Sequence, residues 1–295
     1  MRRDSLADAM LLATTFLWAL NFSVSKYILE HALRPLAYSG VRYAAAALIF
    51  VAITFPWERS LRIARRDLLL VGGAIAVLFA NQLCFVYALD LTTATTVALL
   101  FGTLPILTAV ISRALGIERL GSRFLIAATI SFAGVALVTA GSGSSLSGHV
   151  LGDALAVLAA ATWGAYSVAI APLMRRYSPF RLSAVILLAV SVPLLVIGSP
   201  ELAREDFDWS TLAWMGFVFA VLGPLVTTNL LWFTAIDRVG PSRASLFANL
   251  QPFLAAVIAL LLLDEHLTRL QVAGGFLIAA GIIFSRGREP PAEPM

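Results

Sequence analysis

Few residues of this chain could carry catalytic chemistry, and they are scattered. The three histidines, His31, His149 and His266, lie in joints between apolar runs, and none has a nucleophile near it in the sequence. There is no G-x-x-x-x-G-K-[ST] phosphate loop, so ATP hydrolysis is not expected. The single cysteine, Cys84, excludes an intramolecular disulfide and a cysteine metal cluster. We therefore expect no enzyme activity, no metal site and no bound cofactor.

Aromatic and polar side chains within the apolar runs indicate the binding of a small molecule instead. Trp18 and Asn21 lie three residues apart, on one face of a helix, and a later run repeats this pattern with Trp163 and Tyr166. If these runs cross a membrane, polar groups at that depth are costly unless they face a cavity or another helix. We expect Trp18 and Trp163 to form opposite walls of one cavity. The alternatives are ordinary helix packing and an interfacial aromatic belt.

Two further pairs of polar residues lie mid-way through other runs. Asn81 and Gln82 are flanked by Phe79 and Phe85, and Asn229 follows Thr228 at the equivalent place of a later run. Amides can bind the carboxylate or ammonium of a zwitterion. They also form interhelical hydrogen bonds in membranes. The sequence leaves both roles open.

Arg42 is the only charged residue well inside an apolar run, and Tyr38 precedes it by one helical turn. It could extend along its helix to the membrane surface, or it could attract a substrate that bears a carboxylate. Every Asp and Glu maps near the end of a run, Asp8 and Asp153 among them. This placement disfavours proton coupling through a buried carboxylate.

Prolines mark two places where a helix is expected to open locally. Pro252 follows Asn249 and Gln251, and Pro105 follows Gly102 and Thr103 in an earlier run. A proline within a membrane helix frees backbone groups that need other partners. Pro105 and Pro252 are either hinges or tolerated kinks.

The amino-acid composition indicates that the elements which position these residues are transmembrane helices. Hydrophobic residues make up 60% of the 295, charged residues 13%, and the mean hydropathy is +0.89. A water-soluble protein of this size cannot bury so much apolar surface, so lipid must be the solvent for most of it, and nucleic acid is not expected as a partner. We predict an all-α polytopic membrane protein with ten transmembrane helices, at about 7–29, 36–56, 67–89, 93–113, 122–141, 152–173, 180–198, 211–235, 241–263 and 268–285.

The distribution of basic residues predicts the orientation. With ten spans and a cytoplasmic N-terminus, the inside segments hold 16 Lys and Arg, the outside segments hold four, and Arg42 lies within a span. This is a strong positive-inside bias, and a miscounted helix would destroy it. The first run is longer than 20 residues and lacks a cleavage pattern, so it is interpreted as a retained helix. Both termini are predicted to be cytoplasmic.

Comparison of the chain with itself predicts an internal repeat. At an offset of 145, Asp8-x9-Trp18 matches Asp153-x9-Trp163, and at 147 Pro105 matches Pro252, among several other positions. The predicted units are 7–141 and 152–285, joined by a Gly- and Ser-rich linker at 142–151 and followed by a cytoplasmic tail at 286–295. Five spans in each unit invert the second relative to the first, which is the architecture that supports alternating access.

Tandem five-helix units with an early D-x9-W helix, a fourth helix that bears a proline and an E-x-L loop after it resemble the EamA family of the drug/metabolite transporter superfamily. The resemblance covers nearly the whole chain and implies a secondary transporter of small metabolites in a bacterial inner membrane, usually an exporter. Within the family, the chain is most similar to aromatic amino-acid and paraquat exporters. Small multidrug transporters of the same superfamily use a buried glutamate of the first helix, which this chain lacks.

The leading hypothesis is an alternating-access exporter of small amphiphiles, most of all amino acids including aromatic ones. The substrate-contacting residues are then expected to be Trp18, Asn21, Tyr38, Arg42, Phe79, Asn81, Gln82, Trp163, Tyr166 and Asn229, in a monomer or weak homodimer. A carrier of sugar phosphates or nucleotide sugars would need several buried cations, and only one is present. A lipid scramblase-like protein is also compatible with the sequence. A passive structural subunit is disfavoured by the repeated polar and proline positions.

Overall fold

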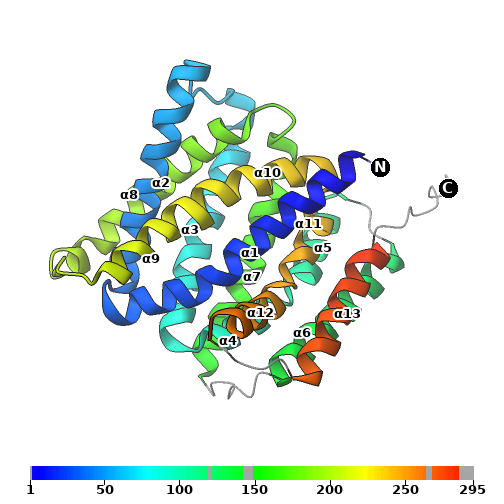
Figure 1. Cartoon of the computed structure of the whole chain (residues 1–295). Coiled ribbons are helices and arrows are strands. Elements are labelled where there is room, and N and C mark those ends of the chain that lie inside the picture. The colour runs from blue at the N-terminus through cyan, green and yellow to red at the C-terminus, as the bar shows by residue number, and fades with distance from the viewer. Residues whose placement is uncertain (1, 119–120, 142–148, 264–267, 286–295) are drawn as a thin grey trace.

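The computed structural model describes residues 2–118, 121–141, 149–263 and 268–285, and every regular element within these ranges is helical (Figure 1). The chain runs through α1 (Arg2–His31), α2 (Pro35–Glu58), the short η1 (Arg65–Asp67), α3 (Leu68–Leu91), α4 (Ala94–Phe101), α5 (Leu104–Ala114), α6 (Ser122–Gly141), α7 (Val150–Leu173), α8 (Pro179–Leu202), α9 (Thr211–Val221), the π-helix η2 (Leu222–Thr227), α10 (Thr228–Val239), α11 (Pro241–Ala248), α12 (Gln251–Leu263) and α13 (Arg269–Ser285). Most of the predicted linker, the predicted tail, His266 and the second E-x-L loop lie outside the described residues.

The helix starts follow from local sequence. Pro35 and Pro179 occupy the first positions of α2 and α8, where a missing N–H removes no intrahelical hydrogen bond. Ser178 caps α8, because its Oγ accepts a hydrogen bond from the backbone N–H three residues on, at 3.1 Å. Thr93 caps α4 and Ser210 caps α9 in the same way.

Eight helices of the described part are long and apolar enough to cross a membrane. They are Ser5–His31, Pro35–Glu58, Arg65–Leu91, Thr96–Ala114, Ser122–Gly141, Val150–Leu173, Pro179–Leu202 and Thr211–Val239. The apolar helix Arg269–Ser285 is shorter, and the predicted ninth span is divided between α11 and α12. An all-helical polytopic membrane protein is thereby confirmed, while the count of ten spans stays a prediction.

Three of the predicted spans are interrupted. The fourth breaks between α4 and α5, and the ninth breaks between α11 and α12. In both cases the break precedes the predicted proline, so that Pro105 and Pro252 each occupy the second position of the following helix. The eighth span contains η2, whose wider turn around Pro224 was not predicted. Proline has no N–H to donate, so each of these prolines removes one regular helix hydrogen bond and contributes to the interruption.

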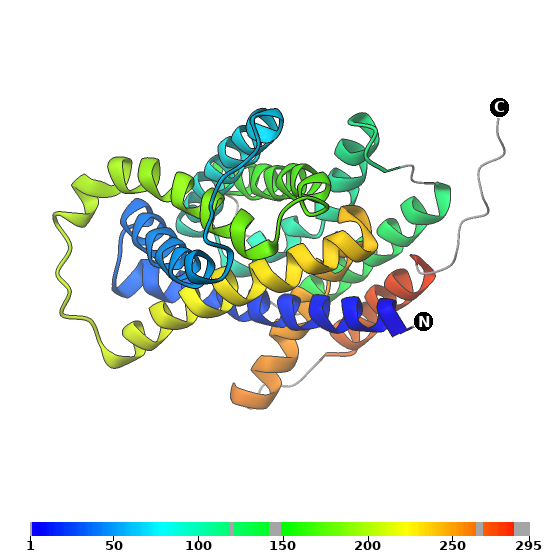
Figure 2. The same cartoon turned by 90° about the horizontal axis from the view of Figure 1, so that it is seen from above.

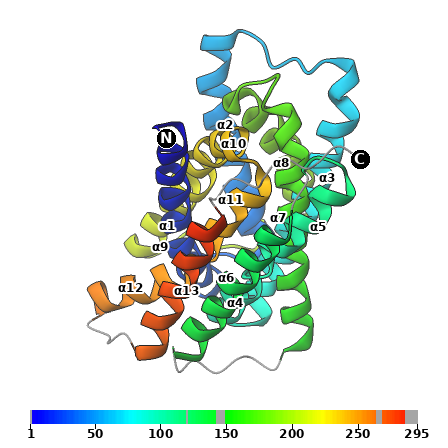
Figure 3. The ribbon, with the colours of Figure 1, turned by 90° about the vertical axis from the view of Figure 1, so that its right-hand side faces the viewer.

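Helices from the two halves of the chain pack against each other in pairs. α2 lies along α8, α6 along α13, α3 along α7, and α1 along α10 (Figures 1 and 2). The α6–α13 pair, seen side by side in Figure 3, approaches closely at Gly134 and Gly274. A Cβ at position 134 would lie 2.6 Å from the carbonyl oxygen of Gly274, so only glycine allows this separation.

Hydrogen bonds between side chains and neighbouring segments join the ends of different helices. At the end predicted to be cytoplasmic, Asp67 before α3 accepts hydrogen bonds from Arg176 and Tyr177 after α7, and Arg123 of α6 donates to a carbonyl near the end of α13. At the opposite end, Glu201 of α8 accepts from two backbone N–H groups at the start of α2. Each of these bonds joins two helix ends that the distribution of basic residues assigns to the same side of the membrane.

Candidate functional site

A central cavity of about 560 Å³, including its open mouth, lies between helices of both halves. Its lining comprises Trp18, Asn21, Phe22, Arg42, Tyr43, Asn81, Gln82, Phe85, Phe101, Leu104, Trp163, Pro224, Leu225 and Gln251. These residues come from α1, α2, α3, α4, α5, α7, η2 and α12. The lining is mainly aromatic and aliphatic with a few polar groups, as in most sites for small organic ligands.

Three indole rings meet at one side of the cavity. The ring of Trp18 lies 5.2 Å from that of Trp163 in an edge-to-face arrangement, and 4.8 Å from that of Trp232. Trp18 Nε1 donates a hydrogen bond to Thr228 Oγ1 at 3.2 Å, which fixes this ring. Trp163 Nε1 is buried without a hydrogen-bond partner. The cluster therefore offers a rigid aromatic surface with one unused N–H donor.

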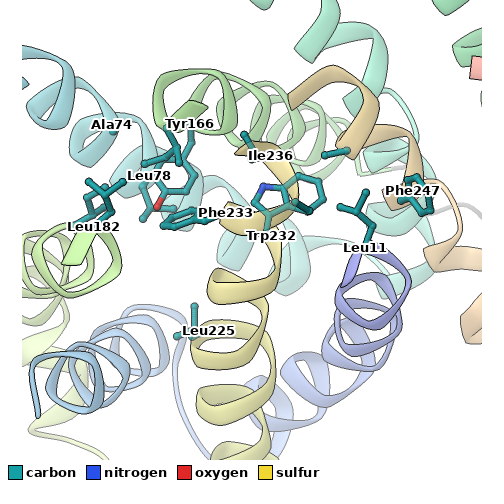
Figure 4. Close-up of a cluster of buried hydrophobic side chains, with 14 of the residues drawn as sticks. Leu11, Ala74, Leu78, Tyr166, Leu182, Leu225, Trp232, Phe233, Ile236 and Phe247 are labelled. Carbon is teal, nitrogen blue, oxygen red and sulfur yellow. The ribbon is translucent and has the colours of Figure 1, made fainter. Parts of the chain in front are cut away.

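Trp232 supports this cluster from behind. It is fully buried on α10, and its Nε1 donates to Ser167 Oγ of α7 at 3.1 Å. Figure 4 shows Phe233 next to Tyr166 of α7, with Leu11 of α1 on the opposite side of Trp232. The residues packed behind the three indole rings come from α1, α7 and α10, so helices of both halves support this cluster.

Arg42 is a buried cation held by neutral groups. Its exposed fraction is 2%, so it does not reach the membrane surface. Nη2 donates to Gln82 Oε1 at 2.8 Å, Nη1 donates to Tyr38 Oη at 3.1 Å, and the guanidinium lies over the rings of Tyr38 and Tyr43. Its Nε has no hydrogen-bond partner, and no carboxylate within the described ranges pairs with it. Such a charge is stabilised by an anionic ligand.

The amides of α3 extend the polar side of the cavity to α7. Gln82 Nε2 donates to Asn81 Oδ1 at 3.1 Å, and Asn81 Nδ2 donates to the carbonyl oxygen of Ala159 at 2.8 Å. These bonds orient the Gln82 oxygen toward Arg42. The two side chains thus form the interhelical hydrogen bonds that were one alternative, and they also line the cavity, while substrate binding stays a prediction.

The structure brings together six of the ten residues predicted to contact substrate. Trp18, Asn21, Arg42, Asn81, Gln82 and Trp163 line the cavity. Tyr38 lies directly behind Arg42. Phe79, Tyr166 and Asn229 are not among the lining residues. Phe79 packs against the hydrophobic core, and Tyr166 lies against Trp163 and Phe233. Asn229 Nδ2 donates to the carbonyl oxygen of Leu225 in η2.

Sequence reasoning missed part of the apolar lining. Phe22 and Tyr43 are direct neighbours of predicted residues, and their type alone carried no signal that distinguished them from the many other aromatic residues of the spans. Phe101 and Leu104 flank the α4–α5 break, and Leu225 lies in the π-helix. A rule that residues next to a predicted helix break line the cavity would have found Phe101 and Leu104, but not Leu225, because the π-helix was not predicted.

The acidic residues Asp8 and Asp153 and the histidine His31 lie outside the cavity, toward the ends of their helices. Asp8 of α1 lies 4.0 Å from Arg243 of α11, and Asp153 of α7 accepts a hydrogen bond from Thr92. His31 stacks on Tyr27. The described residues contain no group of three or more His, Cys, Asp or Glu that could hold a metal ion.

Comparisons with known proteins agree with this architecture. The model of the EamA-like transporter family matches residues 5–140 and again 150–287. An uncharacterized transporter of Bacillus subtilis, YyaM, is 26% identical over 293 residues, covering 94% of this chain and 92% of its own. A probable amino-acid metabolite efflux pump of Escherichia coli is 26% identical over 298 residues, covering 92% and 91%. A solved crystal structure with 18% identity superimposes with a TM-score of 0.78, covering 96% of this chain and 98% of that one, which shows the shared fold.

Proposed function

Because this chain belongs to the EamA-like transporter family, we propose that it is an alternating-access carrier that exports small carboxylate metabolites, most of all amino acids including aromatic ones. The family makes the chain a multi-pass membrane transporter of a small molecule in a lipid environment. The substrate, the direction of transport and the residues that bind are parts of the proposal.

The arrangement around Arg42 is the observation that carries the proposal. A guanidinium has five N–H donors, and the two described hydrogen bonds leave others for a carboxylate. Arginine binds carboxylates well because its planar fork matches their geometry. A single buried cation suits a substrate with one carboxylate better than a doubly charged sugar phosphate or nucleotide sugar.

The aromatic residues of the cavity favour a substrate whose non-carboxylate part is aromatic or aliphatic. Trp18 and Trp163 present ring surfaces to the cavity, and Phe22, Phe85 and Phe101 contribute further apolar lining. The efflux pump of Escherichia coli, by its name, acts on amino-acid metabolites, which favours the same class here. Specificity for aromatic amino acids, in the manner of some of the exporters that the sequence resembles, belongs to the proposal, whereas paraquat, a dication without a carboxylate, does not suit a cavity with a buried arginine.

For the transport cycle we propose that units 7–141 and 152–285 move relative to each other around the cavity. The pairing of α3 with α7 and of α1 with α10 supports two related units, since each pair joins one helix of either unit. The breaks at α4–α5 and α11–α12 border the cavity and are natural sites for bending, with Pro105 and Pro252 next to them. In this proposal both termini are cytoplasmic, the membrane is the bacterial inner membrane, and the protein is a monomer or weak homodimer.

Counterflow in proteoliposomes tests the proposal. Vesicles loaded with unlabelled amino acids receive a trace of labelled phenylalanine, leucine or lysine, and protein-free vesicles serve as the control. We expect accumulation of phenylalanine and leucine above the control. No accumulation of any carboxylate-bearing compound by folded protein would contradict the proposed function. Movement of labelled phospholipid between leaflets would instead support a scramblase.

A further inference from the structure

Gln251 is the first residue of α12, and its side chain lines the cavity at the break between α11 and α12. Its exposed fraction is only 3%, and its amide, which forms no hydrogen bond to the described residues, keeps some accessible surface toward the cavity. Buried amides nearly always have partners, because a lost hydrogen bond to water must be replaced. An unpartnered amide that faces an open cavity can form its hydrogen bond with water or with a ligand bound there.

The other amides of the cavity already use their oxygens. The acceptors and their donors are Asn21 Oδ1 with Ser25 Oγ at 3.2 Å, Asn81 Oδ1 with Gln82 Nε2 at 3.1 Å, and Gln82 Oε1 with Arg42 Nη2 at 2.8 Å. Among the four side-chain amides in the described lining, Gln251 is thus the one with an uncommitted carbonyl oxygen.

The corresponding position in the first half is apolar. Leu104 lies 147 residues before Gln251, is the first residue of α5, and lines the cavity at the α4–α5 break. The two helix breaks therefore present an aliphatic side chain from one half and an amide from the other. This difference gives the cavity a polar position at α12 that is separate from the cation on α2.

We propose that Gln251 determines specificity by accepting a hydrogen bond from the ammonium group of an amino acid whose carboxylate is bound by Arg42. This inference rests on the proposed function. An ammonium group has three donors and no acceptor, so it needs an oxygen such as Gln251 Oε1. A hydrogen bond with a charged donor is stronger than a neutral one. A carboxylate that lacks the amino group gains nothing from this oxygen.

The test compares two ligands that differ only in the amino group, L-phenylalanine and 3-phenylpropanoate. Their dissociation constants are measured by tryptophan fluorescence with purified protein in detergent, for the wild type, Gln251→Leu and Gln251→Glu. In Gln251→Leu we expect phenylalanine to bind about tenfold more weakly, with 3-phenylpropanoate changed less than about twofold. In Gln251→Glu the carboxylate repels 3-phenylpropanoate, so the preference moves toward phenylalanine.

Gln271→Leu is the matched control, because Gln271 is also buried but bonds to Thr268 outside the cavity. Its ligand ratio is expected to equal that of the wild type. Equal weakening of both ligands in Gln251→Leu, or a shift of Gln251→Glu in the opposite direction, would overturn the assignment. If Gln251→Leu does not purify as folded protein, Gln251→Glu decides alone. A wild type that binds neither ligand would contradict the proposed function, whereas binding with unchanged ratios would contradict only the role of Gln251.

Discussion

The indole rings of Trp18 and Trp163 meet edge to face with centroids 5.2 Å apart, although 145 residues separate them in the chain. Each tryptophan follows an aspartate by ten residues, on α1 and α7 respectively. Equivalent positions of two sequence-related helices thus come into direct contact at the cavity. Contact of this kind is expected when two related units enclose a site between them.

Replacing Trp18 by Ala is expected to weaken transport of aromatic substrates selectively. An aromatic pair contributes about 0.5–1.5 kcal/mol beyond the area that it buries, so KM for phenylalanine should rise about three- to tenfold, with a smaller change for alanine. Trp57→Ala is the control, since Trp57 is 79% exposed and does not line the cavity. An equal loss for both amino acids would indicate a purely structural role for Trp18.

Arg42→Ala is expected to lower kcat/KM for carboxylate-bearing substrates by about a hundredfold. That factor corresponds to about 3 kcal/mol, the upper range for a hydrogen bond with a charged group. Arg42→Lys should recover part of the activity, because lysine keeps the charge but not the planar fork. Initial rates of counterflow measure both variants, with Arg62→Ala at an exposed position as control. Unchanged rates in folded Arg42→Ala would exclude carboxylate binding by this residue.

Gly134→Ala is expected to destabilise the α6–α13 pair. The new Cβ would lie 2.6 Å from the Gly274 carbonyl oxygen, and such overpacking costs about 1–3 kcal/mol. Gly72→Ala is the matched control, because a Cβ at Gly72 meets nothing within 4 Å. Unfolding temperatures can be followed with a dye that reacts with the single buried thiol, Cys84. A lower temperature for Gly134→Ala alone is the expected result, and equal temperatures for the two variants would contradict the close approach.

The sequence predicted the helices well because their causes are local. Runs of about 20 apolar residues and prolines such as Pro35 and Pro179 define helix starts and ends without reference to the rest of the fold. The π-helix at Leu222–Thr227 was missed, because a wide turn depends on the surrounding packing as well as on Pro224.

Only part of the cavity lining could be predicted from the sequence, because contacts between different helices are not local. Helical spacing identifies the face on which Trp18 or Arg42 lies, but not which side chains of other helices meet it. Trp232 was missed because a tryptophan in an apolar run gives no sign that two other indoles lie within 6.4 Å. Gln251 was singled out as part of an opened helix, and only the three-dimensional arrangement places it in the cavity lining.

Transport is expected to continue without a proton gradient. Coupling usually needs an acid that binds and releases a proton within the membrane, since moving an unprotonated carboxylate through lipid costs several kcal/mol. No Asp or Glu occurs in the cavity lining of the described residues, and Asp8 lies at a helix end near Arg243. Counterflow of labelled phenylalanine should therefore proceed at equal pH on both sides with an uncoupler present. If it stops while the wild type remains folded, the prediction is wrong, and recovery in Asp8→Asn would identify Asp8 as a coupling site.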